Sequence, residues 1–221
     1  IEMDARASRD GRLMAIHDPL LDRTTDAVKK WRRKRNRVHT HDANSIQGLD
    51  AGSWFGQEFA GIHVPLLSEA LRGIHKGNSL PLVERKAGMA EAYVSLFRKT
   101  SMLSSVVLQS FDWRFLHKVH ELEPRVLLAA LGPAAVLPNG RKPFGLSRRL
   151  TPLWLERAQS ARASIVVWNR RVSRSAIRCA HDKGLSVWVY TIDDLRLARR
   201  LVDAGVDGII TNEPARLRTE L

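Results

Sequence analysis

Cysteine is almost absent from this sequence of 221 residues, which contains only Cys179. An internal disulfide is therefore excluded, and a reducing compartment is indicated, so we expect a cytoplasmic location. No apolar run approaches the roughly 18 residues that a transmembrane helix requires. No secretory leader is visible either, although the chain begins at Ile1 and its natural start is expected to lie outside this sequence.

Acidic residues are scarce relative to basic ones, 23 against 36, which gives a net charge of +13. Seven of the basic residues lie between Lys29 and Arg37, with Trp31 among them. Such a run can contact nucleic acid or anionic lipid headgroups. No similar mixture of basic and aromatic residues recurs, so we interpret residues 26–47 as a solvated basic loop insert. We expect no nucleic-acid partner and no stable membrane insertion, with binding through this run as the alternative.

Short apolar, β-branched runs alternate with amphipathic stretches, which is typical of a parallel α/β sheet. Thr151, Asp112 and Asp193 are candidate helix N-caps, and Gly184 and Gly205 stand where helices are expected to end. The predicted strands are residues 1–5, 80–86, 105–109, 125–130, 164–168, 186–191 and 208–211. The predicted helices are residues 66–75, 90–100, 113–122, 152–162, 173–183 and 195–204, while residues 25–61 and 132–150 are predicted to be irregular.

Polar residues near the carboxyl ends of these strands favour a barrel over an open doubly wound sheet, because barrel active sites are built at that end. A TIM (β/α)8-type barrel needs eight strands, and only seven are predicted beside a short hairpin strand. We therefore expect a single TIM-barrel domain over residues 1–221 that lacks its first strand and helix. The polar residues concerned are Glu2, Asp4, Glu84, Lys86, Gln109, Ser110, Asn169, Thr191 and Thr211.

The first eighteen residues predict a site. Glu2 and Asp4 are two apart on a strand, so both carboxylates face the same side. A turn at Asp10 and Gly11 and a second short strand then bring His17 back toward that side. Two carboxylates and an imidazole together suit a divalent metal and acid–base chemistry.

Several blocks of the sequence, taken in order, resemble the glycerophosphodiester phosphodiesterase family. The first is Ile-Glu-Met-Asp, followed by Asp-Gly-Arg-Leu-Met-Ala-Ile-His-Asp-Pro-Leu-Leu-Asp-Arg-Thr-Thr at residues 10–25. The others stand at residues 49–55, 64–71, 82–86, 109–111, 189–192 and 205–214. The resemblance implies a hydrolase of glycerophosphodiesters, small molecules from lipid and glycerol metabolism, that releases sn-glycerol 3-phosphate and an alcohol.

The resemblance also implies roles for particular residues. The carboxylates of Glu2, Asp4 and Glu84 would bind a divalent cation, Ca²⁺ or Mg²⁺, for which oxygen ligands are suited. Lys86 would contact the phosphate and stabilise its developing charge. His17 would act as a general acid or base. In addition, Trp54 and Phe55 are candidates to contact the leaving alcohol, with packing of the loop on the barrel as the equal alternative.

The sequence departs from the family pattern in several places. It contains no His-Arg-Gly motif and no Pro-Glu-Asn segment, which would supply the second histidine, an arginine and a further carboxylate. Tyr190 replaces a tryptophan and Asn212 an aspartate. We therefore expect impaired turnover from this chain, by about 10²–10⁴-fold. The alternatives are a catalytically degenerate binding protein, the basic binder described above, or a related activity of the lysophospholipase D or sphingomyelinase D type.

Overall fold

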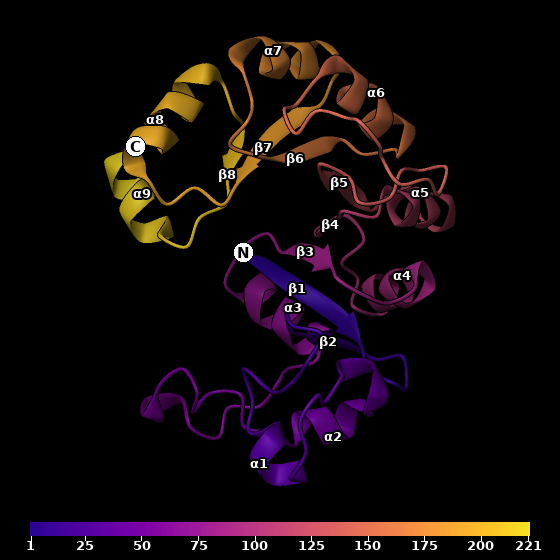
Figure 1. Cartoon of the computed structure of the whole chain (residues 1–221), viewed down its shortest axis with the longest axis vertical. Coiled ribbons are helices and arrows are strands. Elements are labelled where there is room, and N and C mark those ends of the chain that lie inside the picture. Colours follow the sequence, from indigo (N-terminus) through magenta and orange to yellow (C-terminus); the bar gives the residue numbers. More distant parts are fainter. The chain divides into compact units, whose positions relative to one another are not determined.

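The computed structural model describes all 221 residues, and strands alternate with helices along the chain (Figure 1). The chain forms two compact units, residues 1–107 and residues 108–221. None of the helices is long and apolar enough to cross a membrane.

The first unit is built on three strands, which lie side by side in the order β2-β1-β3. They are β1 (Glu2–Ala7), β2 (Leu13–Ala15) and β3 (Leu82–Arg85). β2 folds back antiparallel on β1 through a turn in which Gly11 has a φ of 77°, a value that glycine adopts without strain. β3 pairs parallel to β1, with Asp4 directly opposite Glu84. The register therefore decides which acidic side chains become neighbours.

Helices and one buried cluster complete the first unit. Met14, Ile46 and Leu49 are fully buried in one apolar core, which the long segment after β2 forms together with β2. The segment predicted to be irregular thus contains two short helices, and the side chain of Trp31 packs against the same core. The helices of this unit are α1 (Ala27–Trp31), α2 (Ala43–Gln47), α3 (Leu67–Lys76) and α4 (Ala90–Lys99), with short 3-10 turns at Val38–Thr40 and Gln57–Phe59.

The second unit carries strands in the order β4-β5-β6-β7-β8, and β4 begins at the division between the units. β5, β6, β7 and β8 pair in parallel. The strands are β4 (Val107–Ser110), β5 (Leu127–Gly132), β6 (Ile165–Asn169), β7 (Ser186–Tyr190) and β8 (Gly208–Ile209). The helices are α5 (Trp113–Leu122), α6 (Pro152–Ser160), α7 (Arg174–Asp182), α8 (Leu195–Ala204) and α9 (Pro214–Glu220).

Three tryptophans organise the core of the second unit. Trp113, Trp154 and Trp168 are almost completely buried, and successive ring centroids lie 5.4 Å apart. Each indole N–H donates to a backbone carbonyl, so no indole polar group is left unpaired in the core. Gly132 permits this packing, because a Cβ there would lie 1.9 Å from the Trp168 ring.

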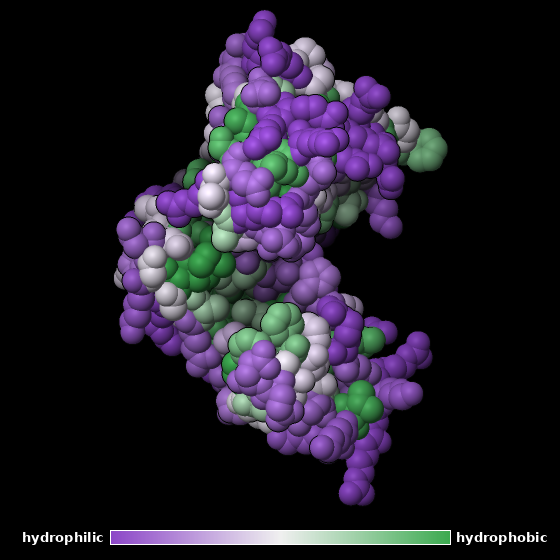
Figure 2. All heavy atoms as spheres, turned by 90° about the vertical axis from the view of Figure 1, so that its left-hand side faces the viewer, coloured by the Kyte–Doolittle hydropathy of each residue, from purple (hydrophilic) through white to green (hydrophobic).

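Most predicted elements are present, shifted by a few residues at their ends. The α/β class is confirmed, and the eight strands are the predicted seven with the hairpin strand. One prediction was wrong: the N-cap of α8 is Asp194, which accepts a hydrogen bond from the Leu197 N–H, while Asp193 binds the side chains of Thr211 and Asn212. The terminal helix α9 was not predicted. The face drawn in Figure 2 is largely hydrophilic, in keeping with the charge of the chain.

Candidate active site

Three carboxylates gather on the first unit. Glu2 and Asp4 project from the same face of β1, and Glu84 reaches them from β3 because it lies opposite Asp4 in the register. One oxygen from each of the three side chains lies within 4.8 Å of the others. Glu84 is buried, and this burial raises its pKa above the ordinary value, against the opposing effect of Lys86.

Lys86 balances this negative charge. Its Nζ lies 2.5 Å from a Glu84 oxygen and 3.2 Å from an Asp4 oxygen. Burial alone would lower the pKa of Lys86, but its contacts with Glu84 and Asp4 raise it above the ordinary value, so the lysine is held as a cation. The site therefore combines three acidic groups with one fixed positive charge.

His17 follows β2 and is positioned by its neighbours. The Asp4 carbonyl accepts a hydrogen bond from the Ile16 N–H, at 3.0 Å, which holds the residue before His17 against β1. The His17 carbonyl accepts a bond from Arg6 Nε at 2.7 Å. Its ring Nδ1 lies 2.7 Å from an Asp18 oxygen, and the ring is exposed. The other ring nitrogen, Nε2, is therefore the one left to exchange a proton with a ligand.

Asp18 is itself held by an arginine. Arg23 donates to both Asp18 oxygens, at 2.6 and 3.1 Å. This pairing, followed by the bond to His17, holds the pKa of Asp18 well below its usual range. Sequence reasoning considered Arg6 only as a possible salt-bridge partner of the strand carboxylates and assigned no role to Arg23, although Arg23 lies within the quoted block at residues 10–25. The pattern contained the residue but not the direction of its side chain.

The two residues predicted to contact the leaving alcohol, Trp54 and Phe55, take no part in the contacts described above among the carboxylates, Lys86, His17 and Asp18. Trp54 and Phe55 lie on the loop after α2, with 50% and 71% of their surfaces exposed. Trp54 is linked to the site through Arg23, whose guanidinium lies 5.7 Å from the Trp54 ring centroid. Phe55 packs on Trp54 and Phe59. Their contact with a leaving alcohol stays a prediction.

Comparison with known proteins assigns the chain to a family. A sequence model of the Glycerophosphoryl diester phosphodiesterase family matches residues 1–216. The chain belongs to this family. The chain is 30% identical to the YhdW protein of Bacillus subtilis, over 97% of this chain and 82% of that protein. It is also 29% identical to the glycerophosphodiester phosphodiesterase of Bacillus subtilis, over 97% of this chain and 73% of that protein.

Solved structures share the fold. The phosphodiesterase of Oleispira antarctica, in complex with the product sn-glycerol-3-phosphate, matches with a TM-score of 0.80 and 21% identity, over 99% of this chain and 83% of that one. A glycerophosphodiester phosphodiesterase of Agrobacterium tumefaciens matches with a TM-score of 0.78 and 25% identity, over 99% and 86%. These matches confirm the predicted (β/α)8-barrel type of α/β fold for a member of the glycerophosphodiester phosphodiesterase family.

The donor set fits the divalent cation that this family implies. Hard cations such as Ca²⁺ and Mg²⁺ prefer carboxylate oxygens, and three such groups converge here without a competing thiol or imidazole among them. Glu2 is exposed and Glu84 is buried, so the cluster opens toward solvent on one side. A cation bound there would remain accessible to water and to a phosphodiester.

Proposed function

We propose that this protein is a metal-dependent phosphodiesterase that hydrolyses glycerophosphodiesters to sn-glycerol 3-phosphate and an alcohol. The observation that carries the proposal is the cluster of Glu2, Asp4 and Glu84 in a chain that belongs to the phosphodiesterase family. Its structural relative from Oleispira antarctica binds the same product. Ca²⁺ or Mg²⁺ would occupy the cluster, and the half-buried single Cys179 is consistent with a reducing, cytoplasmic setting.

The side chains divide the chemistry among them. A bound cation would polarise the phosphoryl oxygens. Lys86 supplies a fixed positive charge beside the carboxylates, where it stabilises negative charge that develops on the phosphate. His17 exchanges a proton through Nε2, because Asp18 engages Nδ1 and fixes the ring. The carboxylates would thus hold the cation, the cation and Lys86 would hold the anionic phosphate, and His17 would move the proton.

Turnover by these 221 residues is expected to be slow. The sequence lacks the His-Arg-Gly motif that supplies the second histidine in the family pattern, and one lost partner of this kind costs about 10²–10⁴-fold. The measurement is kcat for glycerophosphocholine, with the 29% identical Bacillus subtilis enzyme as the reference under the same conditions. Equal turnover of the two proteins would refute the expected impairment.

The function itself is tested by metal-dependent product formation. Release of sn-glycerol 3-phosphate from glycerophosphocholine is measured with Ca²⁺, with Mg²⁺ and with EDTA, in the presence of enough protein to detect slow turnover. Product should form only with a divalent cation. Glu84→Gln should abolish this product and weaken Ca²⁺ binding in calorimetry at least tenfold, whereas Glu91→Gln, an exposed change on α4, should alter neither. Tight binding of sn-glycerol 3-phosphate with no hydrolysis would favour the degenerate binding protein instead.

A second candidate function rests on the basic segment. Lys29, Lys30 and the other five cations through Arg37 are exposed, and none forms an ion pair with a carboxylate. Cations without acidic partners, in a unit that also exposes Trp54 and Phe55, favour an anionic membrane surface. Binding to phosphatidylserine vesicles should weaken steeply with salt and be lost when the seven cations are replaced by glutamine. Equal binding of the replaced protein, or binding to duplex DNA alone, would exclude this function.

A further inference from the structure

A series of side-chain contacts within the first unit connects an aromatic loop to His17. The Arg23 guanidinium lies 5.7 Å from the centroid of the Trp54 ring and donates, at 2.6 and 3.1 Å, to the two oxygens of Asp18. The Asp18 oxygen that accepts the longer of these bonds also lies 2.7 Å from Nδ1 of His17. Trp54 is thus linked to the histidine through two charged groups that hold one another.

The ring of His17 depends on this external hold. Its side chain is 61% exposed, so packing restricts its rotation little. Asp18 can orient the ring only while its own carboxylate keeps one orientation. The planar fork of Arg23 bonds both carboxylate oxygens at once, which fixes a carboxylate more strictly than a single donor does. Arg23 therefore determines which oxygen Asp18 presents to Nδ1.

The ion pair of Arg23 with Asp18 is expected to contribute little to the stability of the fold. The Arg23 side chain is 61% exposed, and such pairs stabilise weakly because water screens the charges and a long side chain loses freedom when it is held. The backbone around Arg23 is fixed by other bonds. The Leu21 N–H donates to the Asn36 carbonyl at 2.8 Å, and the Thr25 hydroxyl donates to the Leu21 carbonyl at 2.7 Å. The role left to the guanidinium is orientation.

The loop that carries Trp54 holds the indole in place. The Asp26 N–H donates to the Asp50 carbonyl at 3.0 Å, and the Asp50 N–H donates to the Asp26 carboxylate at 2.9 Å, so the segments before Trp54 and after Arg23 are joined. The Trp54 indole N–H donates to the Ala51 carbonyl at 2.9 Å. A guanidinium over a tryptophan ring is attracted by its π electrons, so the fixed ring limits how far Arg23 can turn away from Asp18.

We propose that Arg23 and Trp54 are positioning residues for proton transfer by His17, and that both act through Asp18. The inference rests on the proposed hydrolysis, because that function assigns the proton transfer to His17. Trp54 holds Arg23, Arg23 orients the Asp18 carboxylate, and Asp18 leaves Nε2 of His17 directed to the substrate. Trp54 thereby acquires a role other than contact with the leaving alcohol.

The first test follows the imidazole of His17 and needs no turnover. NMR of the ring nitrogens in EDTA, at about pH 8.5 where an ordinary imidazole is neutral, should show the hydrogen on Nδ1, because the Asp18 carboxylate can only accept. Loss of the signals in His17→Gln assigns them. Arg23→Gln should raise the share of the Nε2–H tautomer at least threefold. Arg9→Gln, which removes an equally exposed arginine that donates twice to Asp42, should leave the tautomer unchanged.

The second test is kinetic, with glycerophosphocholine and saturating Ca²⁺. Arg23→Gln should lower kcat about tenfold and change KM less than twofold, because the guanidinium acts on His17 and not on the substrate. Arg23→Lys should recover less than half of that loss, since lysine keeps the charge but cannot form the fork. Trp54→Ala should lower kcat about threefold in the wild type and have no further effect in Arg23→Gln, because both changes break the same series of contacts.

Each measurement can overturn the proposal. An unchanged tautomer in Arg23→Gln would remove Arg23 from the positioning of His17, and a raised KM with unchanged kcat would place it on the substrate instead. Losses that multiply in R23Q/W54A would show that Trp54 acts on its own, as contact with the leaving alcohol predicts. Urea unfolding of the variants should match the wild type, so that a fall in kcat is not a loss of folded protein.

Failure of the proposed function is distinguishable from failure of this inference. A wild-type protein without hydrolysis would reject the function, while the tautomer of His17 would still decide whether Arg23 orients the ring. If Arg23→Gln does not fold, Arg23→Lys replaces it in both tests, and an unchanged tautomer with unchanged kcat in that variant would overturn the requirement for the fork.

Discussion

Replacement of Lys86 by methionine separates two roles of this lysine, the balancing of the Asp4 and Glu84 charges in the folded protein and the stabilisation of the phosphate during hydrolysis. Methionine keeps much of the volume of the stem and removes only the charge that lies 2.5 Å from Glu84 and 3.2 Å from Asp4. The three side chains are only 19%, 10% and 18% exposed, so water compensates the remaining carboxylates poorly. Removal of one partner of a buried pair costs about 3–5 kcal/mol, and partial exposure moves the expected loss in free energy of unfolding toward the lower end, about 2–3 kcal/mol.

The same variant should bind a divalent cation more tightly. In the wild type the Lys86 ammonium competes with a metal for the oxygens of Asp4 and Glu84, and it repels the metal charge. Two unit charges about 4 Å apart interact by roughly 1 kcal/mol in water and roughly 4 kcal/mol near a protein surface. Without the repulsion from Lys86, the affinity for Ca²⁺ should therefore rise about tenfold or more. Hydrolysis should nevertheless fall by about 10²–10³-fold, because the phosphate loses its fixed positive charge.

The assay is urea unfolding in EDTA and in 1 mM CaCl₂, combined with Ca²⁺ calorimetry. K86M should be destabilised in EDTA and should recover much of the loss in CaCl₂, since a ligand that binds the folded state stabilises it according to its affinity. Lys99→Met, an exposed change at the end of α4, serves as the control for loss of a surface charge. Equal stability of K86M and wild type in EDTA, or weaker Ca²⁺ binding, would refute the idea that Lys86 balances the carboxylates.

Three further predictions follow from local geometry. Gly132→Ala places a Cβ 1.9 Å from the Trp168 ring, so denaturant unfolding should show a loss of about 3 kcal/mol or more, and a loss below 1 kcal/mol would contradict this packing. Gly73→Ala lies within α3 with nothing within 4 Å, and the same measurement should show a gain of about 0.5–1 kcal/mol rather than a loss. Asp18→Asn should lower kcat about 10–100-fold, because the ring of His17 loses its orienting carboxylate. Since the pKa of Asp18 is lowered in the folded protein, its stabilising effect is present above pH about 4 and lost in acid, so D18N should reduce the acid dependence of unfolding.

The acidic part of the site was accessible to sequence reasoning because it depends on strand periodicity. Glu2 and Asp4 are two residues apart on one strand, and Glu84 and Lys86 follow the same spacing at the next parallel strand, so a period of two places each pair on one face. The register that sets Asp4 opposite Glu84 came from no pattern in either strand. The family resemblance implied in advance only that the three carboxylates share one cation.

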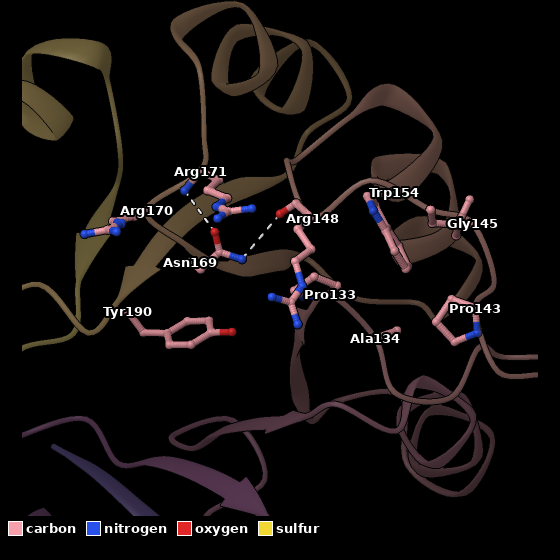
Figure 3. A pocket seen from close by; sticks show the side chains of 11 residues that line it. Pro133, Ala134, Pro143, Gly145, Arg148, Trp154, Asn169, Arg170, Arg171 and Tyr190 are labelled. Atoms are coloured by element: carbon pink, nitrogen blue, oxygen red, sulfur yellow. Dashed lines mark hydrogen bonds between the residues drawn. The ribbon is translucent and has the colours of Figure 1, made fainter.

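What sequence reasoning could not supply is the direction of long side chains and the pairing of distant loops. Arg23 and Asp18 are five residues apart in an irregular segment, where no period fixes which way a guanidinium turns, yet their contact determines how His17 is held. The contact between the Asn169 side chain and the Arg148 carbonyl, at 3.4 Å (Figure 3), is equally beyond sequence reasoning, because it forms only where a proline-rich loop folds back onto the end of β6. Regular elements therefore predict the candidate metal ligands, while charge pairing between loop side chains, which only the folded chain defines, determines how His17 is held.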